Sequence, residues 1–221
     1  MELREQRFGI EIEMTGITRA GAAKVAATYF GTRSEYVGTY YQTYAAVDQE
    51  GRQWKFMSDG SIRAEKKVNG EKRAAGAVYR TEMVSPICRY EDIEKIQELI
   101  RELKKKGAIV NESCGIHVHI DASPFDAGKL RNLTNIMAAK EDLIYKALGV
   151  SVERQHRWCR PVEERFLEEL NRRRPTSMEA VEEIWYNGRS RRGQHYDQSR
   201  YHCLNLHSVF QKGTVEFRLF N

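Results

Sequence analysis

Four short segments of the sequence carry polar side chains two residues apart, with bulky apolar residues on either side of each. The pairs are Glu11/Glu13, His117/His119, Asn205/His207 and Glu216/Arg218. Residues two apart on a β-strand point to the same face, roughly 7 Å from each other. Each segment therefore predicts a strand that turns its apolar residues to the core and its Glu, His, Asn or Arg to the opposite face.

A fifth segment adds Glu82, with Arg80 on the same side. For any single strand, the wet face of an antiparallel sheet would explain such a pattern. A wet face, however, is usually rich in Thr, Lys, Ser and Gln, whereas these positions hold metal ligands and arginine. If the strands are neighbours, Glu11, Glu13 and Glu82 converge with Glu216.

A cluster of carboxylates is unfavourable without a counterion. Two like charges about 4 Å apart, at an effective dielectric constant near 20, repel by on the order of 4 kcal/mol. The cluster must then be partly protonated or hold divalent cations. Carboxylates with only one or two imidazoles favour Mg²⁺ or Mn²⁺ over zinc. Because Mg²⁺ commonly bridges substrate phosphates, a nucleotide is the natural partner.

The elements that must position these residues indicate an α+β fold with a largely antiparallel sheet. Alternation and turn signals predict strands at 7–14, several short strands within 36–62, and further strands at 77–84, 114–121, 201–210 and 214–220. Helical spacing predicts helices at 18–29 and 90–106 and several more between 124 and 183. We expect a single catalytic domain over 1–221, with a helical insertion at about 124–199.

Composition places the chain among soluble globular proteins. It has 221 residues, 41% of them hydrophobic and 30% charged, without an apolar run long enough for a membrane span. The four cysteines form no CxxC pair, which predicts a reducing, cytoplasmic location. The net charge of +5 and the arginines at 172–174 and 189–192 suit anionic partners. They predict a solvated surface rather than a nucleic-acid site, because no aromatic platform accompanies them.

Five segments, in this order along nearly the whole chain, resemble the amidoligase family, relatives of glutamine synthetase and glutamate–cysteine ligase. They are FGIEIE, SDGSI, TEMVSP, CGIHVHID and RYHCLNLHSVFQKGTVEFRLFN. The resemblance implies a glutamine-synthetase-like fold, with a curved, mainly antiparallel sheet and helices on its outer face. It also implies an ATP-dependent ligase: ATP phosphorylates a carboxylate, and an amine then attacks the acyl phosphate to form an amide.

The resemblance also implies roles for single residues. Metal ligands for Mg²⁺, or else Mn²⁺, would be Glu11, Glu13, Glu82, His117 and Glu216. The catalytic arginines would be Arg218, against the transferring γ-phosphate, and Arg200. Other contacts to nucleotide or substrate would come from Asn205, His119, Asp59 and Ser61, the last two in a substrate-side loop.

The sequence also allows two other functional interpretations. A zinc hydrolase would bind its metal through His117, His119 and a glutamate, but it gives no role to the other carboxylates. A non-catalytic, basic nucleic-acid-binding module would account for the arginines alone. For a ligase, the polar segment 187–199 is predicted to be a mobile lid, with Arg200 at its base.

Overall fold

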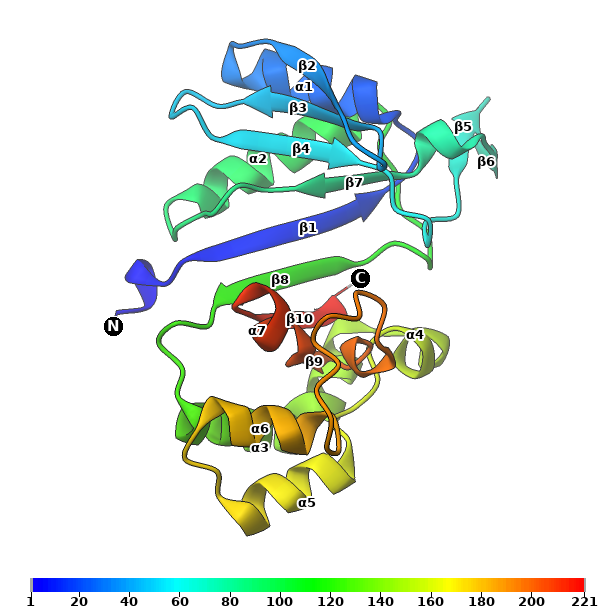
Figure 1. Ribbon diagram of the computed structural model, residues 1–221. Helices are drawn as coiled ribbons and strands as arrows, with labels where there is room; N and C mark the ends of the chain where they lie inside the picture. Colours follow the sequence, from blue (N-terminus) through cyan, green and yellow to red (C-terminus); the bar gives the residue numbers. More distant parts are fainter. Residues whose placement is uncertain (1, 221) are drawn as a thin grey trace. The chain divides into compact units, whose positions relative to one another are not determined.

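The computed structural model describes residues 2–220, and the fold is α+β with antiparallel strands (Figure 1). Two compact units divide the chain, one up to Ile116 and the other from His117 onward. Each unit has its own hydrophobic core. The two units are therefore described one after the other.

The first unit is built on five strands in the order β2-β3-β4-β7-β1, each antiparallel to its neighbour. Their bounds are β1 Phe8–Met14, β2 Ser34–Gly38, β3 Thr43–Val47, β4 Gln53–Met57 and β7 Thr81–Val84. A separate hairpin joins β5 (Glu65–Val68) to β6 (Glu71–Ala74), and two 3₁₀ turns lie at η1 (Leu3–Glu5) and η2 (Ala77–Tyr79). The short strands expected within 36–62 are thus confirmed as β2, β3 and β4.

Two helices supply the other layer of this unit: α1 (Arg19–Phe30) and α2 (Asp92–Lys105). Helix α1 begins where Thr18 accepts a hydrogen bond from the N–H of Gly21, and it ends at Gly31, whose φ is 68°. Its buried residues are mostly alanine, so its backbone can approach the sheet closely. Helix α2 instead buries the larger side chains of Ile96, Leu99 and Leu103.

The pairing register decides which side chains of the sheet face these helices. Ile12 of β1 pairs with Met83 of β7, and the adjacent pair is Glu13 with Glu82. Ile12 and Met83 belong to the core, together with Trp54 and Phe56 of β4. Each large apolar side chain buried there contributes about 1.5–3 kcal/mol to stability. Because successive residues point to opposite faces, the carboxylates lie on the face away from the core, as the alternation predicts.

The second unit contains strands in the order β8-β10-β9 and most of the helices. The strands are β8 Ile116–Asp121, β9 Leu204–Asn205 and β10 Thr214–Phe220. The helices are α3 Ala127–Leu148, α4 Val152–Arg157, α5 Glu164–Arg173, α6 Met178–Trp185 and α7 His207–Lys212, with a 3₁₀ turn at η3 Gln198–Arg200. Helices α3 to α6 follow β8 and precede β9 in sequence, which agrees with the helical residues expected between 124 and 183.

Helices and strands of this unit share one core. Leu130 of α3, Leu170 of α5 and Ile184 of α6 pack in the same cluster as Leu204 of β9 and Val215 of β10. The alternation along β10 therefore turns Val215 inward and leaves Glu216 on the other face. Among residues 2–220, none of the helices is sufficiently long and apolar to span a membrane.

Two expected strands differ from the structure. In the segment 77–84, residues 77–79 form the 3₁₀ turn η2, and only Thr81–Val84 is a strand. The other is wrong over most of its length. The sequence predicted a strand over 201–210, but only Leu204 and Asn205 are extended, and residues 207–212 form helix α7. Gly213 ends this helix in the left-handed conformation, with φ at 72°, and β10 follows directly. His207 is consequently on a helix and does not share a strand face with Asn205.

Candidate active site

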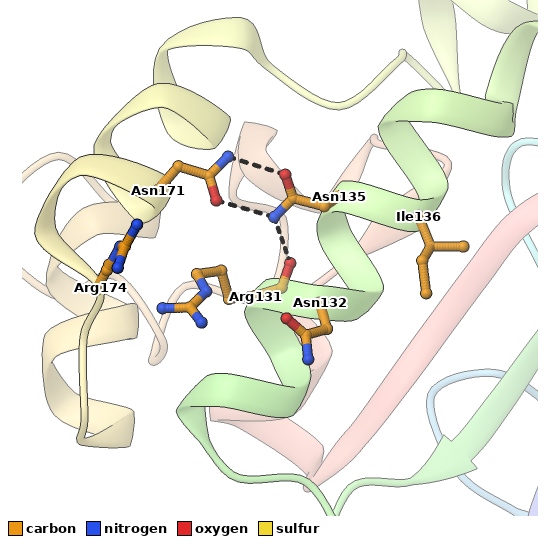
Figure 2. A pocket seen from close by; sticks show the side chains of 6 residues that line it. All are labelled: Arg131, Asn132, Asn135, Ile136, Asn171 and Arg174. Atoms are coloured by element: carbon orange, nitrogen blue, oxygen red, sulfur yellow. Dashed lines mark hydrogen bonds between the residues drawn. The ribbon is translucent and has the colours of Figure 1, made fainter.

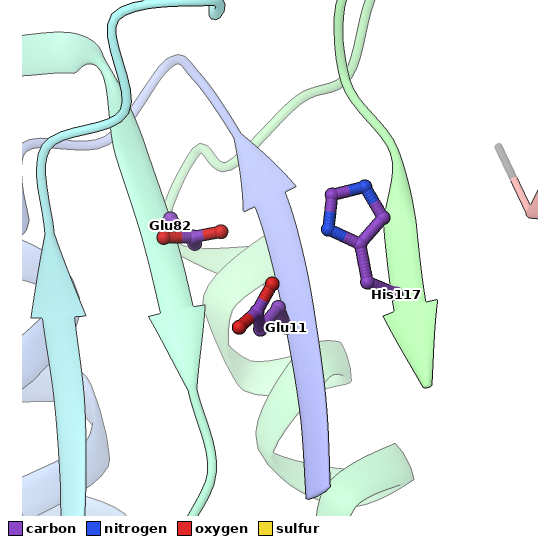
Figure 3. A group of neighbouring side chains, drawn as sticks. All are labelled: Glu11, Glu82 and His117. Carbon is purple, nitrogen blue, oxygen red and sulfur yellow. The ribbon is translucent and has the colours of Figure 1, made fainter. Parts of the chain in front are cut away.

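Two buried carboxylates face each other in the first unit. Glu13 of β1 and Glu82 of β7 are paired residues, and only 5% and 8% of their surfaces are exposed. Glu11 lies on the same face of β1, two residues earlier, and is half-buried. Figure 3 shows Glu11 and Glu82 on the strands β1 and β7; it also labels His117 of β8, which is described with the second unit below. The period-two pattern therefore placed all three carboxylates on one face.

Asp59 joins Glu13 and Glu82 from the turn that follows β4. One carboxylate oxygen from each of the three residues lies within 4.8 Å of the others, an arrangement that could hold a metal ion. The Oδ1 atom of Asp59 accepts hydrogen bonds from the N–H and the hydroxyl of Ser61, both at 2.6 Å. These two bonds orient the half-buried carboxylate of Asp59. The family resemblance assigned both residues to a substrate-side loop, and neither was predicted to join the carboxylate cluster.

The backbone of Gly115 holds Glu13 in position. Its N–H donates to Oε2 of Glu13 at 2.6 Å, and the N–H of Glu13 donates to the Gly115 carbonyl at 3.0 Å. A buried carboxylate that accepts a backbone N–H is favoured in its charged form. These two bonds fix both the strand and the carboxylate at this point of β1.

The charge of this cluster indicates which ligand it suits. Two carboxylates about 5 Å apart, at an effective dielectric constant near 20, repel by roughly 3 kcal/mol. A divalent cation would turn this repulsion into attraction. The donors from Glu13, Asp59 and Glu82 are all oxygens, which fits Mg²⁺ or Mn²⁺ better than zinc.

The second unit holds a different set of polar residues, centred on Glu216 of β10. Nη1 of Arg218 lies 2.5 Å from Oε1 of Glu216, and Nδ2 of Asn205 donates to Oε2 at 2.6 Å. The three side chains are 2% (Glu216), 6% (Arg218) and 1% (Asn205) exposed. Asn205 and Glu216 are paired residues of β9 and β10 and so point to one face. Strand pairing therefore builds a buried, hydrogen-bonded carboxylate next to a guanidinium.

Two imidazoles from β8 approach the same carboxylate. Nδ1 of His117 and Nε2 of His119 lie 3.9 and 3.8 Å from Oε1 of Glu216. His117 and His119 are 5% and 8% exposed, and Nδ1 of His119 lies 3.0 Å from the hydroxyl of Thr214. The HVH segment and the TVEFR segment are thus neighbours in space, although almost a hundred residues separate them.

Arg200 reaches this set through an aromatic ring that the sequence analysis did not single out. The guanidinium carbons of Arg200 and Arg218 lie 5.7 and 5.8 Å from the centre of the Tyr201 ring. Such cation–π contacts favour a fixed guanidinium orientation. Arg200 also donates from Nη1 to the carbonyl of His195 at 2.8 Å. Tyr201 therefore holds both arginines that the resemblance assigns to catalysis.

Sequence reasoning assigned no role to His207. It is 2% exposed, and its Nδ1 lies 2.6 Å from the hydroxyl of Tyr186. Burial lowers the pKa of His207, while the charges of Asp197 and Glu216 partly oppose that effect. The Asn205/His207 spacing was a signal, but the partner Tyr186, which follows α6, could not be found from local sequence.

The segment 187–199, predicted as a mobile lid, is fastened to helix α6. Glu182 is 5% exposed and accepts hydrogen bonds from Nε and Nη2 of Arg192, at 2.9 and 2.5 Å, and from the hydroxyl of Ser190. Gln211 of α7 donates to the Arg192 carbonyl at 3.1 Å. Breaking the pair of a buried carboxylate is costly, which opposes detachment of the segment 187–199 from α6. The lid role stays a prediction.

A separate cavity of about 680 Å³ lies beside helices α3 and α5 (Figure 2). Its lining is polar and basic apart from one isoleucine: Arg131, Asn132, Asn135, Ile136, Asn171 and Arg174. Asn135 and Asn171 exchange two hydrogen bonds, at 2.9 and 2.8 Å, and so link the two helices. None of the residues assigned to metal, nucleotide or substrate lines this cavity.

The comparisons with known proteins agree with the segments quoted from the sequence. The model of the family described as "Putative amidoligase enzyme" matches residues 4–221. The chain matched no curated protein and no solved structure. The family match includes both polar clusters described above. The chain therefore belongs to the amidoligase family.

Proposed function

We propose that this protein is an ATP- and Mg²⁺-dependent carboxylate–amine ligase with a glutamine-synthetase-like catalytic fold. The observation that carries the proposal is the cluster of Glu13, Asp59 and Glu82, whose oxygen donors lie within 4.8 Å of one another. Such a donor set suits a hard divalent cation of the kind that accompanies nucleotide phosphates. Membership of the amidoligase family supplies the reaction class.

The reaction consists of two transfers. An oxygen of the substrate carboxylate attacks the γ-phosphorus of ATP, and ADP leaves. The amine nitrogen then attacks the carbonyl carbon of the acyl phosphate, inorganic phosphate leaves, and the nitrogen loses a proton as the amide forms. Bound Mg²⁺ would neutralise charge on the phosphates during the first transfer.

The proposal gives each cluster a task. Glu11, Glu13, Glu82, His117 and Glu216 are assigned as metal ligands. All of them except Glu11 are buried, and hydrogen bonds hold Glu13 and Glu216. This supports the assignment, since ligands held in place lose little freedom on binding. Asp59 is better assigned to the metal as well, because its carboxylate lies with Glu13 and Glu82.

The arginines and amides are assigned to the anionic groups. Arg218 is held by Glu216 and by the Tyr201 ring, so its guanidinium is oriented before substrate binds. A preoriented guanidinium can offset the charge that develops on a transferring phosphoryl group. Arg200, Asn205 and His119 are assigned to nucleotide or acyl phosphate, and Ser61 to the orientation of Asp59.

A zinc-dependent hydrolase is the second candidate, and one observation favours it. His117, His119 and Glu216 bring two imidazoles and a carboxylate together in the second unit. Two histidines and a glutamate are a known ligand set of catalytic zinc. This candidate gives no role to the all-oxygen cluster of the first unit, and we therefore rank it below the ligase.

Thermal unfolding with different additions tests the two candidates. The melting temperature is measured with Mg²⁺, ATP, Mg²⁺ plus ATP, and Zn²⁺, each against the metal-free protein. A ligand at a hundredfold excess over its Kd stabilises by about 2.7 kcal/mol, which raises the melting temperature of such a domain by on the order of 5 °C or more. The ligase predicts a rise that needs Mg²⁺ and ATP together. A rise with Zn²⁺ alone and none with Mg²⁺ plus ATP would favour the hydrolase.

A further inference from the structure

His207 is a buried histidine with one ring nitrogen held in place. It begins helix α7 and is 2% exposed, and its Nδ1 lies 2.6 Å from the hydroxyl of Tyr186, the residue that follows α6. The two rings meet edge to face, with centres 5.8 Å apart. This contact fixes the orientation of the imidazole, and with it the direction of the other nitrogen, Nε2.

The contact with Tyr186 also bears on where the imidazole carries its proton. Burial raises the pKa of Tyr186, so the phenol keeps its hydrogen. Burial lowers the pKa of His207, so the ring is neutral. We assign the donor role to the hydroxyl of Tyr186, which can donate or accept, and the acceptor role to Nδ1 of His207. In the neutral ring the remaining hydrogen therefore lies on Nε2.

This Nε2–H and one oxygen of Asn205 are buried polar atoms without a hydrogen-bond partner among residues 2–220. The atoms are Nε2 of His207 and Oδ1 of Asn205, and both side chains are at least 98% buried. Buried donors and acceptors are nearly always paired, because leaving one unpaired costs about 1–3 kcal/mol. The two atoms are therefore candidates for contact with a bound molecule.

The surroundings show what kind of molecule these atoms fit. Asn205 donates its amide to Glu216, so its Oδ1 has a fixed direction. The charges of Asp197, Arg200 and Glu216 all act on His207. A neutral N–H donor suits an oxygen acceptor such as a phosphate oxygen, while Oδ1 suits a hydroxyl or amino hydrogen. A nucleoside triphosphate offers both kinds of group.

We propose that His207 is a nucleotide-binding residue, whose Nε2–H donates to a phosphate oxygen while Asn205 Oδ1 accepts a hydrogen from the same nucleotide. Tyr186 is then a positioning residue, since it acts on the nucleotide only through His207. The inference rests on the proposed ATP-dependent ligase and adds a residue outside the metal ligands and arginines assigned above.

Two substitutions of His207 separate the roles of its two nitrogens. The side-chain oxygen of asparagine reaches about as far as Nδ1 and can still accept from Tyr186, but it provides nothing at Nε2. The amide nitrogen of glutamine reaches about as far as Nε2. We expect H207N to raise the Kd for Mg·ATP at least tenfold and H207Q to change it less than threefold. Isothermal titration measures both, and the melting temperature of each variant without ligand reports on folding.

Adenosine and Tyr186→Phe provide the controls. Adenosine has no phosphate, so H207N and the unaltered protein should show the same affinity for it. Tyr186→Phe keeps the ring of Tyr186 but leaves the His207 tautomer unfixed, and we expect a threefold to tenfold increase in the Kd for Mg·ATP. If H207N does not fold, Tyr186→Phe gives the test instead.

The outcomes distinguish this inference from the proposed function. If the unaltered protein does not bind Mg·ATP, the ligase and the role of His207 both fail. If it binds Mg·ATP and H207N binds it equally well, only the role of His207 fails. A loss of adenosine binding in H207N that equals the loss of Mg·ATP binding would refute the phosphate contact.

Discussion

Glu13 and Glu82 face each other as a directly paired couple across β1 and β7, and both carboxylates are buried. Strand pairing puts them there, since the same register places Ile12 against Met83 in the core. In most proteins, like charges directly opposite each other on two strands are destabilising. We infer that the repulsion between Glu13 and Glu82 is tolerated because the two carboxylates bind a cation.

Glu82→Gln should therefore make the metal-free protein more stable. The change removes one charge at nearly constant shape, and we expect the free energy of unfolding to rise by up to about 3 kcal/mol. The stabilisation by Mg²⁺ should be lost in the same variant. Urea unfolding with and without Mg²⁺ measures both effects. Glu35→Gln, at an exposed position of β2, is the matched control and should change neither quantity. Destabilisation of the metal-free protein by Glu82→Gln would contradict the inference of repulsion.

Arg218→Ala should destabilise the protein strongly. The change leaves Glu216 buried without its guanidinium partner, and breaking such a pair costs about 3–5 kcal/mol. Arg172→Ala removes an exposed guanidinium that lies 2.6 Å from Glu169, and it should cost less than about 1 kcal/mol. Denaturant unfolding compares the two variants. Equal, small effects would mean that water reaches Glu216 freely.

An ion pair between the half-buried Arg52 and the buried Asp92 in the first unit should make stability depend on pH. Nη1 and Nη2 of Arg52 donate to Asp92 at 2.9 and 2.7 Å, and these bonds hold the pKa of Asp92 far below its usual range. The pKa in the folded state lies below that in the unfolded state. The contribution to stability is therefore present above about pH 4 and is lost as the pH falls below it.

Asp92→Asn tests this dependence. At pH 7 the variant should be less stable by about 1–3 kcal/mol, and the difference from the unaltered protein should shrink steadily below about pH 4. Urea midpoints between pH 2 and pH 7 measure it. Asp142→Asn, at an exposed position of α3, is the control and should show no such trend. A difference that stays constant down to pH 2 would refute the pKa argument.

Gly16 follows β1 at a point of close backbone approach. Its φ is 80°, and a Cβ atom added to it would lie 2.3 Å from the carbonyl oxygen of Gly107. Gly16→Ala should therefore cost more than about 2 kcal/mol, because the backbone itself must move. Gly31 has φ at 68° with open space around it, so Gly31→Ala should cost only about 1 kcal/mol. If the two variants have equal unfolding free energies, the backbone around Gly107 moves at little cost.

Much of the carboxylate arrangement could be predicted because alternation is a local property. In IEIEM the period of two determines which residues share a face, and the structure confirms this for Glu11 and Glu13. The same reasoning located Glu216 and Arg218 on the face opposite Val215. Burial of the apolar residues on the other face stabilises this arrangement, so the strands fold as the alternation predicts.

The remaining features depend on contacts that local sequence does not encode. The segment after Asn205 also alternates, yet Leu206 adopts helical dihedral angles and α7 follows, because Val209 packs in the core and Gly213 provides a left-handed end. The meeting of Tyr186 with His207 depends on how α6 packs. Asp59 reaches Glu13 and Glu82 through a turn whose direction Ser61 sets. Neither residue propensity nor residue spacing predicts any of these three features.

The register of β1 has a consequence for how this family can vary in length. A substitution between Glu11 and Glu13 alters one contact, but an inserted or deleted residue there would rotate every later side chain of the strand to the opposite face. A deletion, for example, would put Glu13 in the apolar layer beneath α1 and α2 and Met14 in its place opposite Glu82. We expect relatives to tolerate gaps in the hairpin of β5 and β6, and to keep the spacing within β1 unchanged even where few of its residues are the same.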